Sequence, residues 1–118
     1  MSLRIRVKRI YDAPSDEDGY RVLIDRLWPR GIRKEAARLD AWKKALAPST
    51  ELRKRFAHDP AKFEDFAARY RLELEDCQGA IEELRLAVIG DLLTLLYAAA
   101  DPVHNHAVIL RDYLQEYL

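Results

Sequence analysis

Cysteine is nearly absent from this chain of 118 residues, where Cys77 is the only one. A single cysteine excludes a disulfide within the chain and a zinc site built from several thiolates of one chain. Glycine is scarce as well, and none of the motifs G-x-x-x-x-G-K-[ST], G-x-G-x-x-G and G-x-S-x-G occurs. A nucleoside-triphosphate loop, a dinucleotide fingerprint and a hydrolase nucleophile elbow are therefore unsupported, and no cofactor is predicted.

Long hydrophobic runs are also missing. The longest, around Leu92 to Ala100, reaches about half of the roughly 20 residues that a membrane-spanning helix needs. The first residues alternate charged and aliphatic side chains, without the apolar block of a signal peptide. We therefore expect a cytoplasmic protein that makes no membrane contact. A chain of this length is expected to form one domain, over residues 1–118.

Neither sign of charge is in excess, because 20 Lys and Arg balance 20 Asp and Glu. The distribution along the chain is nevertheless uneven. Residues 1–59 contain 15 basic and 9 acidic side chains, whereas residues 60–118 contain 5 basic and 11 acidic ones. Two interpretations stay open. Either the two halves attract each other within one domain, or the first half presents a basic surface to an anionic partner.

Three segments have the patterns of β-strands. Aliphatic and basic residues alternate over residues 3–8, which predicts an outer strand with one exposed face. Residues 20–24 and 92–97 are more uniformly apolar, which is typical of strands covered on both faces. Pro29 and Gly31 follow the segment over residues 20–24. We therefore expect a shaped loop where that strand ends.

The first predicted helix rests on three apolar residues spaced i, i+3 and i+7, and Pro48 ends it. These three residues are Leu39, Trp42 and Leu46. Ser49 or Thr50 is expected to cap the next helix, which would turn Leu52 and Phe56 toward the core.

Three more helices are expected in the second half of the chain. The first begins at Asp59-Pro60 and continues to Cys77, and a weaker one stops near Gly90. The last occupies residues 102–117, where Asp101-Pro102 again forms a cap and proline pair. Its inward residues are expected to be Val103, Ala107, Leu110, Leu114 and Tyr117.

Helices between buried strands imply a parallel crossover, so the predicted fold class is α/β. We expect a small, mostly parallel sheet of about three strands with helices on both faces. The nine-residue linker over residues 11–19 is shorter than the dozen or so residues of a usual parallel crossover. The first strand is therefore either parallel to the second or an antiparallel edge strand.

Ligands of open α/β sheets bind beyond the carboxyl ends of the strands, and two polar segments lie there. Asp25 to Gly31 follows the central strand, and Asp101 to His106 follows the last one. Arg26 and Arg30 are expected to bind an anion near the N-terminus of the final helix, while Asp25 orients an arginine or takes a proton. The alternative is that these arginines only pair with carboxylates at the surface.

His106 is the candidate for acid–base chemistry near neutral pH, with Asn105 and His104 as ligand-binding neighbours. On a regular helix His104 and His106 diverge by about 200°, so they cannot share a metal ion and no metal site is predicted. The alternative for His106 is a partly buried imidazole that meets a backbone carbonyl. Ser49 and Arg53 are further candidates for contacts to the anion, although helix capping explains Ser49 equally well.

Three other side chains have mainly structural interpretations. Cys77 closes an apolar stripe and is expected to be a buried small hydrophobe. Trp28 is expected to pack against its neighbours. His58 follows a predicted helix and either enters the site or is exposed.

Three motifs occur in order: DRLWPRG at residues 25–31, PSTELRK at residues 48–54 and NHA at residues 105–107. With their flanking residues they resemble the YeaO-like branch of a bacterial family, domain of unknown function 488, over nearly the whole chain. The resemblance implies a small single-domain α/β protein with no established reaction. Longer family members carry a strand ending in Asp-x-Arg and a late Cys-His-Arg, which Asp25, Arg26 and Asn105-His106-Ala107 match in part. Because the late cysteine and arginine are missing here, the resemblance carries no thiol-dependent chemistry to this chain.

Two functions of different classes follow from the sequence. The first is binding of a small anionic ligand, of the phosphate or carboxylate type, at the strand ends, with or without catalysis. The second is a non-catalytic interaction module that binds nucleic acid or an acidic protein through the basic N-terminal half. A third possibility is a homodimer formed through an apolar helix face.

Overall fold

The computed structural model describes residues 3–117, so Met1, Ser2 and Leu118 lie outside the described part. The fold is α/β, as predicted, with one parallel sheet of strand order β1-β4-β2-β3. The strands are β1 (Arg4–Arg9), β2 (Tyr20–Leu23), β3 (Ala41–Trp42) and β4 (Leu92–Tyr97). The helices are α1 (Lys34–Ala37), α2 (Thr50–Phe56), α3 (Phe63–Glu75), α4 (Gln78–Ala87) and α5 (His106–Tyr117). Short 3-10 turns are η1 (Asp16–Asp18), η2 (Lys44–Leu46) and η3 (Pro60–Lys62).

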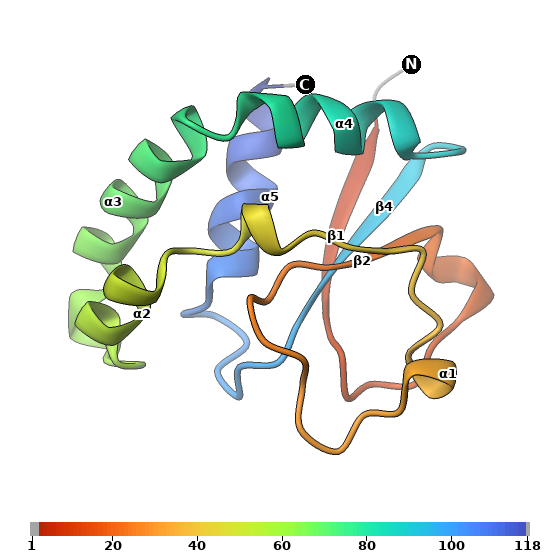
Figure 1. Ribbon diagram of the computed structural model, residues 1–118, viewed down its shortest axis with the longest axis horizontal. Coiled ribbons are helices and arrows are strands. Elements are labelled where there is room, and N and C mark those ends of the chain that lie inside the picture. The colour runs from red at the N-terminus through yellow and green to blue at the C-terminus, as the bar shows by residue number, and fades with distance from the viewer. Residues whose placement is uncertain (1–2, 118) are drawn as a thin grey trace.

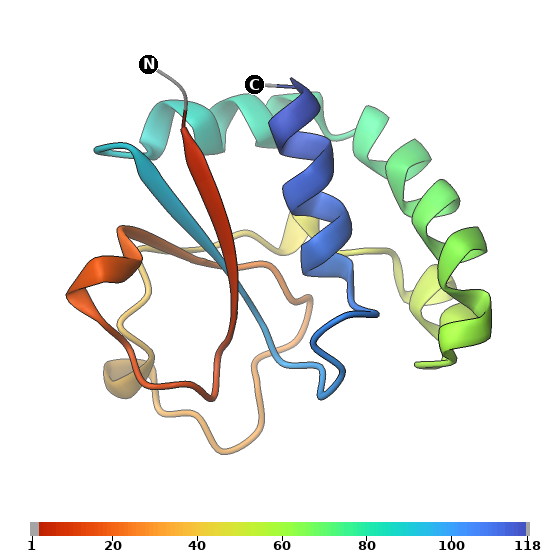
Figure 2. The ribbon, with the colours of Figure 1, turned by 180° about the vertical axis from the view of Figure 1, so that it is seen from behind.

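The β1 strand lies at the edge of the sheet and pairs with β4 in parallel, with Ile5 opposite Leu93. The antiparallel alternative for this strand is therefore wrong. The linker to β2 is long enough for a parallel return, because ten residues can reach about 33 Å. The return needs about 20 Å along a six-residue strand and about 10 Å across two strand spacings. A crossover built from one 3-10 turn needs less chain than one that contains an α-helix (Figure 2).

One face of the sheet carries most of the core. Side chains such as Val22, Ile24 and Leu95 pack there under α3, α4 and α5, which lie along this face in Figure 1. On the other face Leu23 and Leu96 meet a smaller cluster around α1 and its flanking loops. The central strand β4 is buried along its whole length, as its uniformly apolar sequence predicted.

The helix predicted from Leu39, Trp42 and Leu46 does not form. In its place the chain leaves α1 through Arg38, whose φ of 49° is left-handed, and then forms β3 and η2. Trp42 pairs with Leu23 across the sheet and donates its indole N–H to the Asp25 carbonyl oxygen, 2.7 Å away. The free edge of β2 needs a hydrogen-bonding partner, and that requirement overrides the helical spacing.

The helices that follow agree better with the sequence. Ser49 caps α2 by accepting a hydrogen bond from the Leu52 N–H, as predicted. Asp59 caps η3, which leads into α3. The end of α3 at Glu75 leaves Cys77 just outside the helix, where its half-buried thiol lies 3.3 Å from the Ala45 carbonyl oxygen. Burial raises the pKa of this thiol.

The last helix starts four residues later than predicted. Asp101 accepts hydrogen bonds from the N–H groups of Val103 and His104 in a separate turn, so it does not cap α5. Asn105 has that role and accepts a hydrogen bond from the Val108 N–H at 3.1 Å. Val103, expected to face inward, is 61% exposed. The prediction also fails at the other end, where Tyr117 is 44% exposed.

A buried ion-pair cluster fixes the segment between β1 and β2. Asp18 receives hydrogen bonds from Lys8 and Arg21, and Arg21 also donates to the carbonyl oxygens of Ala37 and Arg38. Burial by itself would raise the pKa of Asp18, but the hydrogen bonds from Ser15, Lys8 and Arg21 together lower it. The cluster thereby joins η1 to the end of α1, on the face opposite the main helices. Within the described residues, every helix is too short or too polar to cross a bilayer.

Candidate functional site

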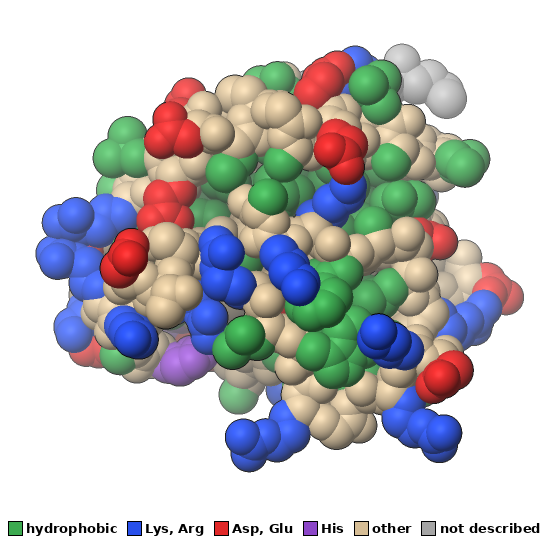
Figure 3. All heavy atoms as spheres, in the orientation of Figure 1, with side chains coloured by type: hydrophobic (Ala, Val, Ile, Leu, Met, Phe, Trp, Pro, Cys, Tyr) green, Lys and Arg blue, Asp and Glu red, His purple; other side chains and the backbone are tan. Residues whose placement is uncertain are grey.

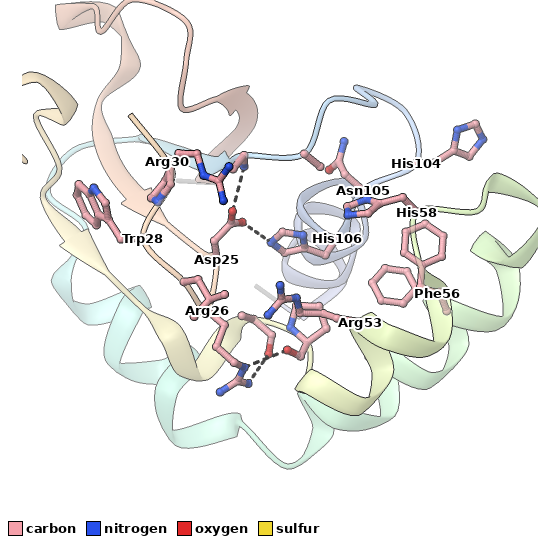
Figure 4. Close-up of a pocket in the computed structure, with 17 residues that line it drawn as sticks. Asp25, Arg26, Trp28, Arg30, Arg53, Phe56, His58, His104, Asn105 and His106 are labelled. Carbon is pink, nitrogen blue, oxygen red and sulfur yellow. Dashed lines mark hydrogen bonds and ion pairs between the residues drawn. The ribbon is translucent and has the colours of Figure 1, made fainter. Parts of the chain in front are cut away.

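A pocket of about 320 Å³ lies where β2 and β4 end and α5 begins. Its walls come from residues 25–30 after β2, Ala47 and Pro48, residues 98–99 after β4, residues 104–106 at the start of α5, and parts of α2, α3 and the turn after α2. Figure 4 shows the side chains of these segments converging from both sides. The position matches the ligand edge of an open α/β sheet.

Asp25 and His106 meet at the centre of this pocket (Figure 4). One carboxylate oxygen of Asp25 accepts a hydrogen bond from the Ala98 N–H at 3.1 Å, which joins the ends of β2 and β4. The other oxygen, Oδ1, is 3.0 Å from His106 Nε2. Both side chains are largely buried, with 17% and 14% of their surface exposed.

The imidazole of His106 is held by the backbone at the end of β2. Its Nε2 lies 3.1 Å from the Ile24 carbonyl oxygen, and both neighbours of Nε2 are acceptors. Nε2 therefore carries the ring hydrogen and donates it to Ile24. This is the backbone-bonded arrangement that the sequence left as the alternative for His106. Asp25 Oδ1 has no aligned hydrogen bond within the described residues, so its contact with the ring is the 3.0 Å approach to Nε2.

Arg26 is occupied by backbone groups. Its Nε and one terminal nitrogen donate to the carbonyl oxygens of Pro48 and Ala47, each at 3.2 Å. These bonds hold the segment before α2 against the end of β2. Arg26 lines the pocket, but much of its hydrogen-bonding capacity is used in positioning that wall.

Arg30 and Arg53 line the same pocket and are exposed. Their guanidinium groups make no hydrogen bond or ion pair with any residue from 3 to 117. Arg30 comes from the loop after β2, whose position is fixed by a 2.9 Å hydrogen bond from the Tyr11 hydroxyl to the Arg30 carbonyl oxygen. Arg53 comes from α2 on another side of the pocket (Figure 4).

His104 and Asn105 belong to the turn that precedes α5, and both line the pocket. His104 Nδ1 lies 2.8 Å from an Asp101 carboxylate oxygen. The backbone N–H groups of His104 and Val103, and then the His104 ring, lower the pKa of Asp101 to about 2. Asn105 is 2% exposed and uses its amide to bond the Asp101 carbonyl oxygen and the Val108 N–H, so it shapes the turn.

Ser49 lies outside the pocket. Its hydroxyl donates to Glu73 at 2.6 Å and accepts from the Leu52 N–H, which ties the start of α2 to α3. Ser49 and Glu73 contribute to a separate, more open depression beside α2. Of the eight site residues predicted from the sequence, seven line the pocket and Ser49 does not.

The sequence patterns do not predict the aromatic part of the pocket. Helical spacing assigns Phe56 and Phe66 to the core alone, yet both also line the pocket. His58, for which the sequence leaves two positions open, lines it as well. The sequence contains one signal for an unusual backbone at His58. Helices often end on a glycine in the left-handed conformation, and no glycine follows α2, so Ala57 and His58 adopt that conformation themselves. Trp28 packs against Trp42 at 5.3 Å between ring centroids, as expected, and also contributes to the pocket wall.

The described residues hold no group of three or more His, Cys, Asp or Glu side chains arranged to bind a metal ion. Arginine and histidine side chains outnumber carboxylates among the lining residues. The nitrogens of these basic side chains recognise carboxylate or phosphate oxygens.

Comparison with known proteins gives relatives of the same length. The chain is 46% identical over 115 residues to "Uncharacterized protein YeaO" of Escherichia coli (strain K12), covering 96% of this chain and 98% of that protein. It is 42% identical over 111 residues to "Uncharacterized protein Rv3073c" of Mycobacterium tuberculosis (strain ATCC 25618 / H37Rv), covering 94% and 93%. No solved structure gives a significant match. A family model described as "Inactive DUF488-N3 subclade" matches residues 4–118, and the chain therefore belongs to this branch of the DUF488 family.

Proposed function

We propose that this protein binds a small anionic ligand, of the phosphate or carboxylate type, in the pocket at the strand ends. The observation that carries the proposal is the charge of the lining. Three arginines and three histidines line the pocket, and Asp25 is the one carboxylate among the lining residues. A cavity with this lining favours an anion over a neutral or cationic ligand.

Arg30 and Arg53 are the residues that hold the anion in this proposal. A guanidinium group can form two parallel hydrogen bonds to a carboxylate or phosphate. Because neither guanidinium is paired with another described residue, neither has to break an existing bond to receive a ligand. Both are exposed at the rim, so an incoming ligand reaches them from solvent.

The start of α5 adds to the attraction. His106 is the first residue of this helix and lines the pocket, so the N-terminal end of the helix borders the cavity. The helix dipole places partial positive charge at that end. Asp101 does not occupy the N–H groups of this helix, because its carboxylate is engaged in the preceding turn.

Binding without catalysis is the version of this function that the arrangement favours. The ring hydrogen of His106 is already donated to the Ile24 carbonyl oxygen, and Asp25 is bonded to the Ala98 N–H. In this proposal the two residues position the pocket wall. Cys77 is not a lining residue. The name of the matching family model, which contains the word "inactive", agrees with this choice.

The test is isothermal titration calorimetry of the purified protein with inorganic phosphate, ribose 5-phosphate and citrate. We expect at least one of them to bind, and Arg30→Ala and Arg53→Ala each to weaken it about tenfold or more, the size of a lost charged hydrogen bond. Arg33→Ala and Lys54→Ala are matched controls, because they remove one exposed positive charge close by without touching the pocket. Equal losses in all four variants, or no binding by the wild type, would refute the proposal.

A basic surface supports a second candidate function, the binding of nucleic acid. Residues 26–55 contain 10 Lys and Arg but 3 Asp and Glu. Figure 3 shows Lys and Arg side chains spread over the lower part of one face, which holds few acidic ones. Binding of this type weakens steeply with added salt. Fluorescence anisotropy with a single strand of about 20 nucleotides at about 50 and 200 mM salt tests it, and absence of binding at the lower salt concentration excludes it.

A further inference from the structure

The pocket is larger than a single oxyanion. Its volume of about 320 Å³ corresponds to about ten water molecules at the roughly 30 Å³ that each occupies in the liquid. Pockets for organic ligands begin at about 300 Å³. A phosphate or sulfate ion at the rim would leave most of this space unfilled, so the ligand needs a second, bulkier part.

The chemistry of that second part is indicated by an aromatic wall, which we define as Phe56, His58, Phe66 and His104. All four line the pocket. The rings of Phe56 and Phe66 are stacked with centroids 4.3 Å apart, and His58 lies 6.3 Å from Phe56. His104 packs edge-on against Phe63 at 5.2 Å. Figure 4 shows Phe56 and His58 on one side of the pocket, with Trp28 across the pocket from them.

The backbone at His58, which lines the pocket, has an unfavourable left-handed conformation. His58 has a φ of 56°, and Ala57 before it has a φ of 50°. Two consecutive residues with side chains in the left-handed region are unusual, and each costs of order 1 kcal/mol or more. The helix C-cap of α2 accounts for Ala57, and strained backbone such as that of His58 clusters at active sites and ligand-binding segments. Its effect here is to place an exposed imidazole on the aromatic wall, beside the arginine rim.

We infer that the ligand is a nucleoside phosphate, bound through its phosphate at Arg30 and Arg53 and through its base against the aromatic wall. Every nucleobase has a flat aromatic face, so any of the bases can stack on an aromatic side chain. An aliphatic group would need no aromatic partner. The paired features, guanidinium groups and aromatic rings in one pocket, match the two ends of a nucleotide. This inference rests on the proposed function, since it uses the same arginines.

The experiment compares ligands that each carry one part. Calorimetric titrations use AMP, GMP, CMP and UMP, with ribose 5-phosphate as the phosphate without a base and adenosine as the base without a phosphate. At least one mononucleotide is expected to bind about tenfold or more tightly than ribose 5-phosphate, because stacking of one base adds that much affinity. Adenosine is expected to bind more weakly than AMP by a similar factor.

His58→Gly separates stacking from charge. Glycine adopts a φ of 56° freely, so this variant removes the ring without straining the backbone. We expect it to weaken mononucleotide binding at least threefold more than it weakens ribose 5-phosphate binding, because only the mononucleotide loses a stacking partner. Ala57→Gly is the matched control, since it relaxes the neighbouring left-handed residue and removes no lining side chain. Equal nucleotide affinity in wild type and His58→Gly would overturn the role of the wall.

The outcomes distinguish this inference from the function on which it rests. If ribose 5-phosphate and the mononucleotides bind equally and Arg30→Ala weakens both, the pocket binds anions and the nucleotide inference is wrong. If nothing binds, both are wrong. A 5′-phosphorylated trinucleotide identifies the source of the nucleotide. Tighter binding than the mononucleotide, with a steep salt dependence, indicates the end of a nucleic-acid strand, and equal binding indicates a free nucleotide.

Discussion

Asp25 and His106 join three separate parts of the chain at one point. Asp25 bonds to the Ala98 N–H after β4 and brings its other oxygen to 3.0 Å from the His106 ring at the start of α5. The same ring donates to the Ile24 carbonyl oxygen at the end of β2. The pair thereby fixes the ends of two strands and the first turn of a helix around the pocket.

A double-mutant cycle measures this coupling. Asp25→Asn removes the carboxylate charge beside the His106 ring, so it is expected to lower the free energy of unfolding by about 0.5–3 kcal/mol, the usual range for a disturbed buried polar pair. In a His106→Ala background the same change is expected to cost less, with a coupling energy of about 0.5–3 kcal/mol. Urea denaturation of the four proteins gives the value. Additivity of the two changes to within about 0.5 kcal/mol would contradict the coupling.

Tyr70 supports the pocket wall from below. Its buried hydroxyl donates to the Leu46 carbonyl oxygen, next to the Ala47 and Pro48 carbonyls that Arg26 holds. Burial raises the pKa of Tyr70 well above its ordinary value, so the hydroxyl stays protonated and keeps donating.

Tyr70→Phe removes this donor and leaves a buried carbonyl oxygen unpaired. We expect a loss of about 1–3 kcal/mol in the free energy of unfolding, measured by urea denaturation. Tyr117→Phe serves as the control, because its side chain is 44% exposed and its change is expected to stay within about 0.5 kcal/mol. Equal effects of the two substitutions would show that the Leu46 bond contributes nothing.

Gly19 and Gly79 are expected to respond oppositely to alanine. Gly19 precedes β2 with a φ of 66°, and a Cβ there would overlap the Leu92 carbonyl oxygen and lie 2.9 Å from the Leu92 Cβ. Gly19→Ala is therefore expected to destabilise the fold by about 3 kcal/mol or more. Gly79 lies in α4, where the methyl group of an alanine would meet no neighbouring atom within 4 Å, so Gly79→Ala is expected to stabilise by about 0.5–1 kcal/mol. Thermal unfolding of the two variants and the wild type measures both effects. Destabilisation of similar size in the two variants would contradict the prediction.

The pKa of Asp101 gives a pH-dependent prediction. A carboxylate whose pKa is about 2 in the folded protein, against about 3.9 when unfolded, stabilises the fold above about pH 4. This contribution is lost as the pH falls from about 4 to about 2. The stability difference between wild type and Asp101→Ala should shrink over that interval, as followed by urea denaturation.

Carbon-13 titration of the Asp101 carboxyl by NMR separates the causes. The backbone N–H groups of His104 and Val103 contribute before the imidazole does. In His104→Ala the pKa of Asp101 is therefore expected to rise only part of the way to its ordinary value. A full return would show that the ring, and not the backbone, holds the carboxylate ionised.

The sequence by itself determined the elements whose signals are local. The alternation at residues 3–8 located β1 to within one residue, and the apolar run at residues 92–97 gave β4 with its bounds. Ser49 specified the start of α2. These signals are local. Alternation and apolar runs depend on which faces of a single strand are buried, and a capping side chain bonds an N–H group within three residues of itself.

Only the tertiary structure decided what each strand end and polar group meets. The edge of β2 turned residues 41–42 into β3, and pairing with a strand almost 90 residues away made β1 parallel. Arg26, Arg30 and Arg53 look alike in the sequence, yet distant carbonyl oxygens occupy the first and leave the other two at the rim. A side chain's hydrogen-bonding partners depend on which segments fold beside it, and sequence periodicity does not contain that information.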